Sequence, residues 1–302
     1  MQNTVTTKDQ PLEAEEIQAR LALILNRFDA AQKKRANWES LWEECYNYAL
    51  PQRGGFTSQP MAGQSKTDQI YDATAMDAAD QLASSMLGNL TPTWSQWFGL
   101  KPGPELSDEE AERLAPVLEK AAKTIQDHFD RSNFAVEIHQ CYLDLIVGGT
   151  ASLVFEESQP GSFSAFKFSS TPLTHVVLEE GDNGHLDGAF RLMKLTLEQI
   201  KSRYPASEFP TEIIRRAARD PQERFKILEA VLPDGLIYSY HACLIEQGDQ
   251  PVLLSAGKFE QSPMISFRWL KSPGEIYGRS PIMKALPDIK TANKVVELIL
   301  KN

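Results

Sequence analysis

The chain has 302 residues, which is enough for one large domain or two ordinary ones. Hydrophobic residues make up 42% of it and charged residues 24%, values typical of a globular protein with a sizeable core. The formal net charge of -10 argues against broad, nonspecific affinity for nucleic acid, although it does not exclude a surface past which DNA slides without sticking.

The cysteines and the first residues restrict where the protein works. Cys45, Cys141 and Cys243 lie far apart, so they form neither a disulfide framework nor a paired metal-ligand spacing. Residues 1–11 are polar and are predicted to be a disordered leader, not a signal or transit peptide. No apolar run approaches the roughly 18 residues that a membrane helix needs. The sequence therefore predicts a soluble protein of a reducing cytoplasm, with no membrane partner.

A helical period runs through the first half of the chain, and residues 12–149 are predicted to be its helical part. Over residues 12–50, apolar side chains share one helix face: Ile17, Leu21, Ile24, Leu25 and Phe28. Pro51 ends this long helix. The basic run Lys33-Lys34-Arg35 within it is interpreted as a solvated face in preference to a phosphate contact.

Three more helices are predicted in this half, over residues 68–90, 107–131 and 134–147. Ser107 and Glu110 form a capping box at the start of the second, and Gly148-Gly149 ends the third as a left-handed cap. The first two helices are joined by a segment that contains an aromatic cluster, made of Trp94, Trp97 and Phe98. Few basic residues lie nearby, so a core or subunit contact is favoured over a base-stacking surface.

The period changes at Thr150, and residues 150–270 are predicted to be an α+β part with a meandering antiparallel sheet. Runs typical of strands cover residues 151–157, 165–169, 175–179, 188–194, 226–232, 236–244, 252–255 and 264–270. Asn183-Gly184 is a hairpin signal between two of these runs. Two short helices, residues 196–204 and 211–219, interrupt the strands, with Thr196 as a cap of the first.

Residues 271–302 are predicted to be a linker and the start of a long helix. Ser280 is a good N-cap, and Pro281 fits the first helical position because its missing N–H costs nothing there. Apolar residues then recur in steps of four and three, with Asn293 filling the one gap; this seam consists of Ile282, Leu286, Ile289, Val296 and Leu300. Pro287 is expected to bend the helix near residues 282–287. Since no signal closes the helix before Asn302, we expect that part of a larger protein follows.

Patterns of catalytic chemistry are weak throughout, so no catalytic, metal or cofactor site is predicted and we do not expect an enzyme. The segment Gly63–Thr67 lacks the glycine spacing of a phosphate loop, and no nucleophile elbow occurs. The acidic group Glu179, Glu180 and Asp182 lacks the alternating ligands of a calcium loop. The histidines show no ligand or triad spacing; they are His128, His139, His175, His185 and His241.

Several short motifs occur in a characteristic order. They are Arg35–Trp38 and Leu41–Arg53, Tyr71–Ala75, Leu82–Met86, Leu90–Pro92 with Trp97–Leu100, Ser132–Phe134, Gly148–Ala151, and the helix-start motif Tyr277, Gly278, Arg279, Ser280 and Pro281 followed by residues 285–290. Together, from about Ala30 to Asn302, the chain resembles the head-to-tail connector, or portal, proteins of short-tailed bacteriophages.

This resemblance implies a fold and a role. It implies a wing that reaches about Leu270, followed by a first stem helix from Ser280, so the expected fold is α+β with long N-terminal helices, a mixed or antiparallel β domain and a C-terminal stem helix. It implies a homododecameric ring at one capsid vertex of the virion, assembled in the host cytoplasm with capsid and scaffolding proteins. Double-stranded DNA would pass through the ring without sequence specificity, during packaging and ejection. The terminase large subunit and later the tail adaptor proteins would dock on the ring.

Two other functions stay open at this point. One is a phage enzyme of unknown class, such as a hydrolase, which requires a cleft with convergent ionisable groups. The other is an assembly adaptor unrelated to portals, in which the last helix would be completed and packed within the chain. The seam residues are expected to face neighbouring subunits if the connector hypothesis holds.

Overall fold

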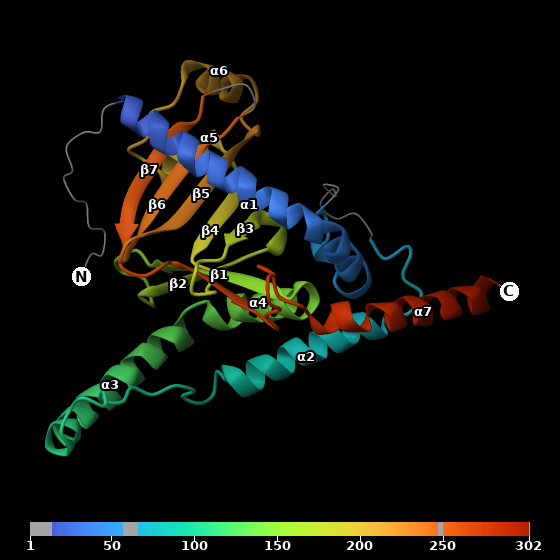
Figure 1. Cartoon of the computed structure of the whole chain (residues 1–302), viewed down its shortest axis with the longest axis horizontal. Coiled ribbons are helices and arrows are strands. Elements are labelled where there is room, and N and C mark those ends of the chain that lie inside the picture. Colours follow the sequence, from blue (N-terminus) through green and yellow to red (C-terminus); the bar gives the residue numbers. More distant parts are fainter. Residues whose placement is uncertain (1–13, 57–65, 247–249, 302) are drawn as a thin grey trace. The chain divides into compact units, whose positions relative to one another are not determined.

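The computed structural model describes residues 14–56, 66–246 and 250–301, and it confirms a mixed α+β protein (Figure 1). Its α-helices are α1 (Ala14–Ala49), α2 (Thr74–Leu90), α3 (Asp108–Arg131), α4 (Phe134–Gly148), α5 (Leu197–Arg203), α6 (Thr211–Arg219) and α7 (Pro281–Lys301). Its strands are β1 (Thr150–Glu157), β2 (Phe166–Thr171), β3 (Val176–Glu179), β4 (Gly188–Thr196), β5 (Arg224–Asp234), β6 (Ile237–Leu244), β7 (Val252–Phe259) and β8 (Met264–Arg268). The leader predicted over residues 1–11 and most of the Gly63–Thr67 segment lie outside the described residues.

Contacts group the chain into two compact units that do not follow the order of the sequence. The first, the sheet unit, contains the described residues up to Leu41, together with Leu173–Met264 and Pro273–Tyr277. The second, the helix unit, contains Trp42–Pro172, Ile265–Ser272 and the described part of Gly278–Asn302. Each unit therefore draws on three separate stretches of chain, whereas the sequence ranges 12–149, 150–270 and 271–302 separate kinds of secondary structure.

The sheet unit is built on a five-stranded sheet with the order β3-β4-β5-β6-β7, in which neighbouring strands pair antiparallel. Strand β5 is buried on both faces: Leu228 and Ala230 join a cluster with Phe28 of α1, whereas Phe225 and Ile227 join one with α5 and α6. Two covered faces explain why β5 is a nearly continuous apolar run instead of an alternating one. Figure 1 shows α1 lying across this sheet.

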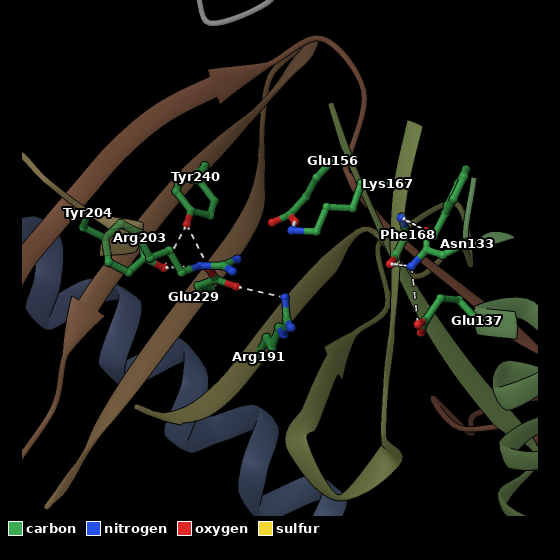
Figure 2. A network of polar contacts seen from close by, with 10 residues as sticks. All are labelled: Asn133, Glu137, Glu156, Lys167, Phe168, Arg191, Arg203, Tyr204, Glu229 and Tyr240. Atoms are coloured by element: carbon green, nitrogen blue, oxygen red, sulfur yellow. Dashed lines mark hydrogen bonds and ion pairs between the residues drawn. The ribbon is translucent and has the colours of Figure 1, made fainter. Parts of the chain in front are cut away.

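The helix unit is organised around α4. Its last eight residues, Cys141–Gly148, are all buried, and it packs against α2, α3, α7 and the sheet of order β2-β1-β8. Small residues at every fourth position of α2 form its buried face, which allows the two helices to approach closely; they are Ala75, Ala79 and Ala83. At the other end of α4, the Asn133 side chain exchanges two hydrogen bonds, of 2.7 and 2.9 Å, with the Phe168 backbone of β2 (Figure 2).

Most local signals are confirmed. The capping box of Ser107 and Glu110 starts α3, Gly149 ends α4 with φ 76°, and Thr196 caps α5. Two interpretations were wrong. Arg35 is buried and donates to the Thr174 carbonyl (3.2 Å), so the basic run is not wholly solvated. Helix α2 begins at Thr74 instead of Asp68, because the backbone before it is held by a side chain of α7, as described below.

Within residues 14–56, 66–246 and 250–301, no helix is both long enough and apolar enough to cross a bilayer.

Candidate functional site: the base of α7

The helix-start motif forms a joint with the end of α4. Ser280 serves both helices, since its hydroxyl donates to the Val147 carbonyl of α4 (2.8 Å) and accepts from the Met283 amide of α7 (2.9 Å). The second bond is the N-cap predicted from the sequence. The first ties that cap to an otherwise unpaired carbonyl in the last turn of α4. One buried side chain therefore sets where α7 begins relative to α4.

Two glycines complete this joint by direct backbone contact. A Cβ added to Gly278 would lie 2.2 Å from the Gly149 carbonyl oxygen, and one added to Gly149 would lie 2.1 Å from that of Gly278. The Gly278 amide donates to the Thr150 hydroxyl (2.9 Å), and the Gly149 carbonyl accepts from the Trp269 amide (2.9 Å). The glycines are therefore required by close approach, and Gly149 also by its left-handed φ.

The first residue of the motif has a different role, within the sheet unit. Tyr277 is fully buried, and its hydroxyl accepts a hydrogen bond from the Leu178 amide of β3 (3.1 Å). Its ring lies 5.9 Å from that of Trp38 in α1, and burial raises the pKa of its phenol to about 12. Tyr277 therefore anchors the segment before α7 as a neutral phenol.

The motif Leu41–Arg53 also converges on α4, around a buried carboxylate. Asp144 is 1% exposed and accepts from the Tyr46 hydroxyl (2.9 Å), while its other oxygen pairs with Arg53 Nη1 (2.8 Å). Arg53 also donates to the carbonyl and side-chain oxygens of Gln140, and Trp42 Nε1 donates to the Gly148 carbonyl (3.0 Å). These contacts fix the same end of α4 that receives α7.

Burial dominates the electrostatics of this cluster. It raises the pKa of the Asp144 carboxyl above its ordinary value, and the Arg53 charge with its hydrogen bond opposes that shift. Burial likewise raises the pKa of the Tyr46 phenol, with Asp144 as the second cause. An ionised Asp144 thus depends on Arg53 for its counter-charge. A signal in the sequence was overlooked here, because a lone Asp inside the apolar run Leu143–Val147 points to a buried ion pair.

The structure places the five seam residues in three environments. Ile282 and Leu286 are buried within the helix unit, where α7 packs on α4, whereas Ile289 and Val296 are half-buried and Leu300 is 68% exposed. Within residues 14–56, 66–246 and 250–301, the distal end of the seam is thus its most exposed part. Helix α7 runs through Pro287 without interruption, and the bend expected there stays a prediction.

The polar residue of the seam has a specific structural role. Asn293 is buried; its Oδ1 accepts from the amides of Tyr71 (2.6 Å) and Asp72 (3.1 Å), and its Nδ2 donates to the Gln69 carbonyl (3.1 Å). It thereby holds the backbone that leads into α2. Sequence spacing placed Asn293 on the apolar face but carried no sign of this contact, which joins residues more than 220 positions apart.

Replacing Asn293 by Ala should release this segment. Two backbone amides then lose their acceptor, a loss of about 1–3 kcal/mol for buried donors. We expect hydrogen exchange at the Tyr71 and Asp72 amides to accelerate by roughly tenfold or more, while exchange in the sheet unit stays unchanged. Asn89→Ala is the matched control, because Asn89 is exposed and donates to the Ser85 carbonyl within α2. Unchanged protection at Tyr71 and Asp72 would show that the Asn293 contacts do not hold this segment.

Glu229, a buried carboxylate of the sheet unit, is the centre of a polar network. Figure 2 shows Glu229, whose Oε1 accepts from Arg203 (3.0 Å), Tyr204 (2.6 Å) and Tyr240 (3.0 Å), and whose Oε2 lies 3.5 Å from Arg191. Burial raises the pKa of both tyrosines, with the Glu229 charge as the second cause. With its oxygens satisfied by neighbours, Glu229 is suited to hold strands and α5 together.

A cavity of about 600 Å³ in the sheet unit lies beside α6, and its lining includes Glu208, Glu212 and Glu246 together with apolar and uncharged polar residues. Glu246 is paired with Arg216 (3.2 Å), and Glu212 lies 3.7 Å from Arg215.

Elsewhere in this unit, burial, aided by Arg20, lowers the pKa of His241 to about 4. Across the described ranges, no three His, Cys, Asp or Glu residues gather as metal ligands would.

Comparisons with known proteins cover both units. Residues 21–302 match the family model described as bacteriophage head to tail connecting protein. The chain is also similar to a protein named "Probable portal protein" of Bordetella phage BPP-1, with 25% identity over 281 residues; the match covers 89% of this chain and 50% of that relative. The chain thus spans about half the length of the curated relative that it matches. The family match begins inside α1 and includes the joint and α7.

Proposed function

This chain belongs to the bacteriophage head to tail connecting proteins, and from that premise we propose that it is a structural subunit of a portal ring at one capsid vertex. In this role the ring is the passage through which DNA is packaged and later ejected. The observation that carries the proposal is α7: its base is locked to α4, while its distal half projects apolar side chains that the described chain does not cover. A helix held at one end and apolar at the other is suited to assembly.

The partners follow from this role. Copies of the chain form the ring, which we propose to be a dodecamer within the virion, first assembled with capsid and scaffolding proteins in the host cytoplasm. The terminase large subunit docks during packaging, and tail adaptor proteins replace it. The net charge of -10 supports a passage that double-stranded DNA crosses without a sequence-specific or tight phosphate contact.

A structural role also accounts for the charged groups better than an enzymatic one. The matched family and relative are structural proteins, and the buried carboxylates Asp144 and Glu229 are each engaged by neighbouring donors. An unrelated adaptor would have its last helix covered within the chain, whereas Val295, Leu298 and Ile299 are 49%, 51% and 69% exposed. We therefore propose that the protein is not an enzyme and that α7 is the first stem helix.

The test is the assembly state of the purified full-length protein. We expect sedimentation velocity to show a closed oligomer and negative-stain microscopy to show a ring with a central channel. Cryo-microscopy of the virion should place the ring at a single vertex. A protein that stays monomeric at high concentration and is absent from capsids contradicts the proposal.

A further inference from the structure

The five-stranded sheet of the sheet unit has two outer strands, β3 and β7, and they differ in what covers them. On β3, the Leu178 amide donates to the Tyr277 hydroxyl (3.1 Å). On β7, by contrast, no strand among the residues that the structure describes pairs with the outer side (Figure 1). An uncovered edge of a sheet is a template on which another chain can add a strand.

The pairing pattern shows which amides of β7 point away from the sheet. The Ile245 amide donates to the Lys226 carbonyl (2.9 Å), so every second residue of β6, counted from Ile245, bonds to β5. The residues between them, which include Tyr240, bond to β7, and the partner of Tyr240 is Gly257. Since amides alternate in direction along a strand, the amide of the neighbouring Ala256 points outward, and this residue is exposed.

The cavity of about 600 Å³ lies beside the first residues of this strand. Its apolar lining includes Ile213, Leu244 and Leu254, which are 1%, 3% and 6% exposed and belong to one core cluster. Besides β7, the lining draws on α1 through Ile17 and Gln18, and on the loop before α6. A strand added to the edge of β7 would therefore place side chains next to a ready-made cavity.

The charged groups of the cavity are negative. Among the described residues, its lining includes Glu208, Glu212 and Glu246 but no Lys, Arg or His. Glu246 pairs with Arg216 and Glu212 lies near Arg215, whereas Glu208 is exposed and has no ion pair within the described part of the chain. Buried apolar residues together with exposed carboxylates match the alkyl stem and the cationic head of a Lys or Arg side chain.

We propose that the outer edge of β7 binds an extended, basic segment of another protein as an added strand, and that an Arg or Lys side chain of this segment enters the cavity. Main-chain hydrogen bonds, one of them from the Ala256 amide, hold the segment, and the cavity selects its charge. This inference goes beyond the proposed portal role. It does not depend on ring formation, because the edge and the cavity both lie within the sheet unit.

The test measures the binding of labelled synthetic peptides to the full-length protein by fluorescence anisotropy. The arginine peptide alternates valine with arginine over eight residues, the length of β7. The glutamate peptide replaces each arginine by glutamate, and the methylated peptide keeps the arginines but has N-methyl groups in place of alternate backbone N–H donors. The arginine peptide should bind saturably, and the other two should bind at least about tenfold more weakly, since each loses one kind of contact.

Two variants of the protein test the same contacts from the other side. Combining Glu208→Lys with Glu212→Lys reverses the exposed carboxylates and should weaken binding of the arginine peptide by about tenfold or more. The matched control reverses the same number of charges, at Glu112 and Glu119, which are exposed on α3 in the helix unit, and it should bind like the wild type. Ala256→Pro removes the outward amide donor at a position where an edge strand tolerates proline, so binding should be lost while the melting temperature changes little. If Ala256→Pro fails to fold, the methylated peptide tests the backbone contact instead.

Several outcomes overturn the inference. One is equal affinity for the arginine and glutamate peptides, and another is wild-type affinity in both protein variants. If the arginine peptide binds only after residues 2–11 are deleted, this segment of the chain itself covers the edge. If it binds only where the protein has dissociated into monomers, a second copy covers the edge; either result excludes a separate partner. A monomeric protein that binds the arginine peptide contradicts the proposed ring but leaves this inference standing.

Discussion

Replacing Arg53 by Met should lower the free energy of unfolding at pH 7 by about 3–5 kcal/mol, the cost of leaving a buried charge without its partner. Arg53 pairs with Asp144 at 2.8 Å, and the carboxylate side chain is 2% exposed. Methionine keeps an unbranched apolar stem like that of arginine but supplies neither charge nor donors. Urea denaturation measures the loss. A change below about 1 kcal/mol would mean that water or another donor already compensates Asp144.

The effect should depend on pH in a defined direction. The pKa of Asp144 is raised in the folded protein, chiefly by burial. A raised carboxyl pKa favours folding below the unfolded value near 3.9, and that contribution is lost as pH rises through the folded pKa. Removing Arg53 removes a cause that lowers this pKa, so the ionised form becomes more costly. The difference between variant and wild type should therefore be largest at pH 7 and shrink toward pH 4.

Two further variants distinguish the effect of the unpaired Asp144 charge from the effect of lost side-chain packing. In the Arg53→Met background, Asp144→Asn removes the unpaired charge but keeps an acceptor for Tyr46, so it should recover a large part of the loss at pH 7. Arg215→Met is the matched surface control, because the Arg215 side chain is 69% exposed, and it should change stability by less than about 0.5 kcal/mol. If the double variant is as unstable as the single one, lost packing and not charge explains the effect.

Replacing Gly278 by Ala should destabilise the joint at the base of α7 by about 3 kcal/mol, the upper part of the usual range for overpacking. The new methyl would lie 2.2 Å from the Gly149 carbonyl oxygen and 3.0 Å from Arg268 Cβ. The first obstacle is backbone and cannot rotate away. The joint must therefore open, which also weakens the Ser280 contact with Val147. Urea denaturation and faster exchange of the Gly278 amide measure this.

Other glycines of this chain supply controls for the two causes of destabilisation, steric clash and backbone strain. Gly99 has open space around it and no positive φ, so Gly99→Ala should change stability by less than about 0.5 kcal/mol. Gly149→Ala combines the clash with a left-handed φ of 76°, whereas Gly274→Ala has a φ of 78° and open space. Strain alone costs about 1–2 kcal/mol, so Gly149→Ala should be clearly worse than Gly274→Ala. Equal losses at Gly149 and Gly274 would contradict a steric joint.

Much of the fold could be predicted because its signals are local. The capping box of Ser107, the left-handed Gly149, the cap at Thr196 and the Ser280-Pro281 start all depend on neighbours within about four residues. The start of α2 was missed although it has a local signal, since Asp72 Oδ1 accepts from the Thr74 amide (3.0 Å). The backbone before it is also held by Asn293, which lies more than 220 residues away in the sequence.

The candidate site likewise combines local signals, which the sequence shows, with contacts between distant residues, which it does not show. The motif from Tyr277 to Pro281 stood out in the sequence, but the sequence indicates only that Gly278 is conformationally flexible. Its partner Gly149 lies in another motif, and only the folded chain brings the two backbones together. Likewise, Asp144 and Arg53 come from separate motifs, and their pairing follows from how η1 (Pro51–Arg53) meets α4.

The sequence by itself determined the helices and strands, the α+β class and the family resemblance. Helix caps, apolar periodicity and short motifs all depend on residues that are close together in the sequence. Only the tertiary structure decided which face of α7 is covered. A period of three and four defines an apolar face but not its partner, because burial depends on what the rest of the chain brings to that face. Here α4 and residues 69–72 cover the lower seam, whereas Val295, Leu298 and Ile299, on another side of α7, stay exposed.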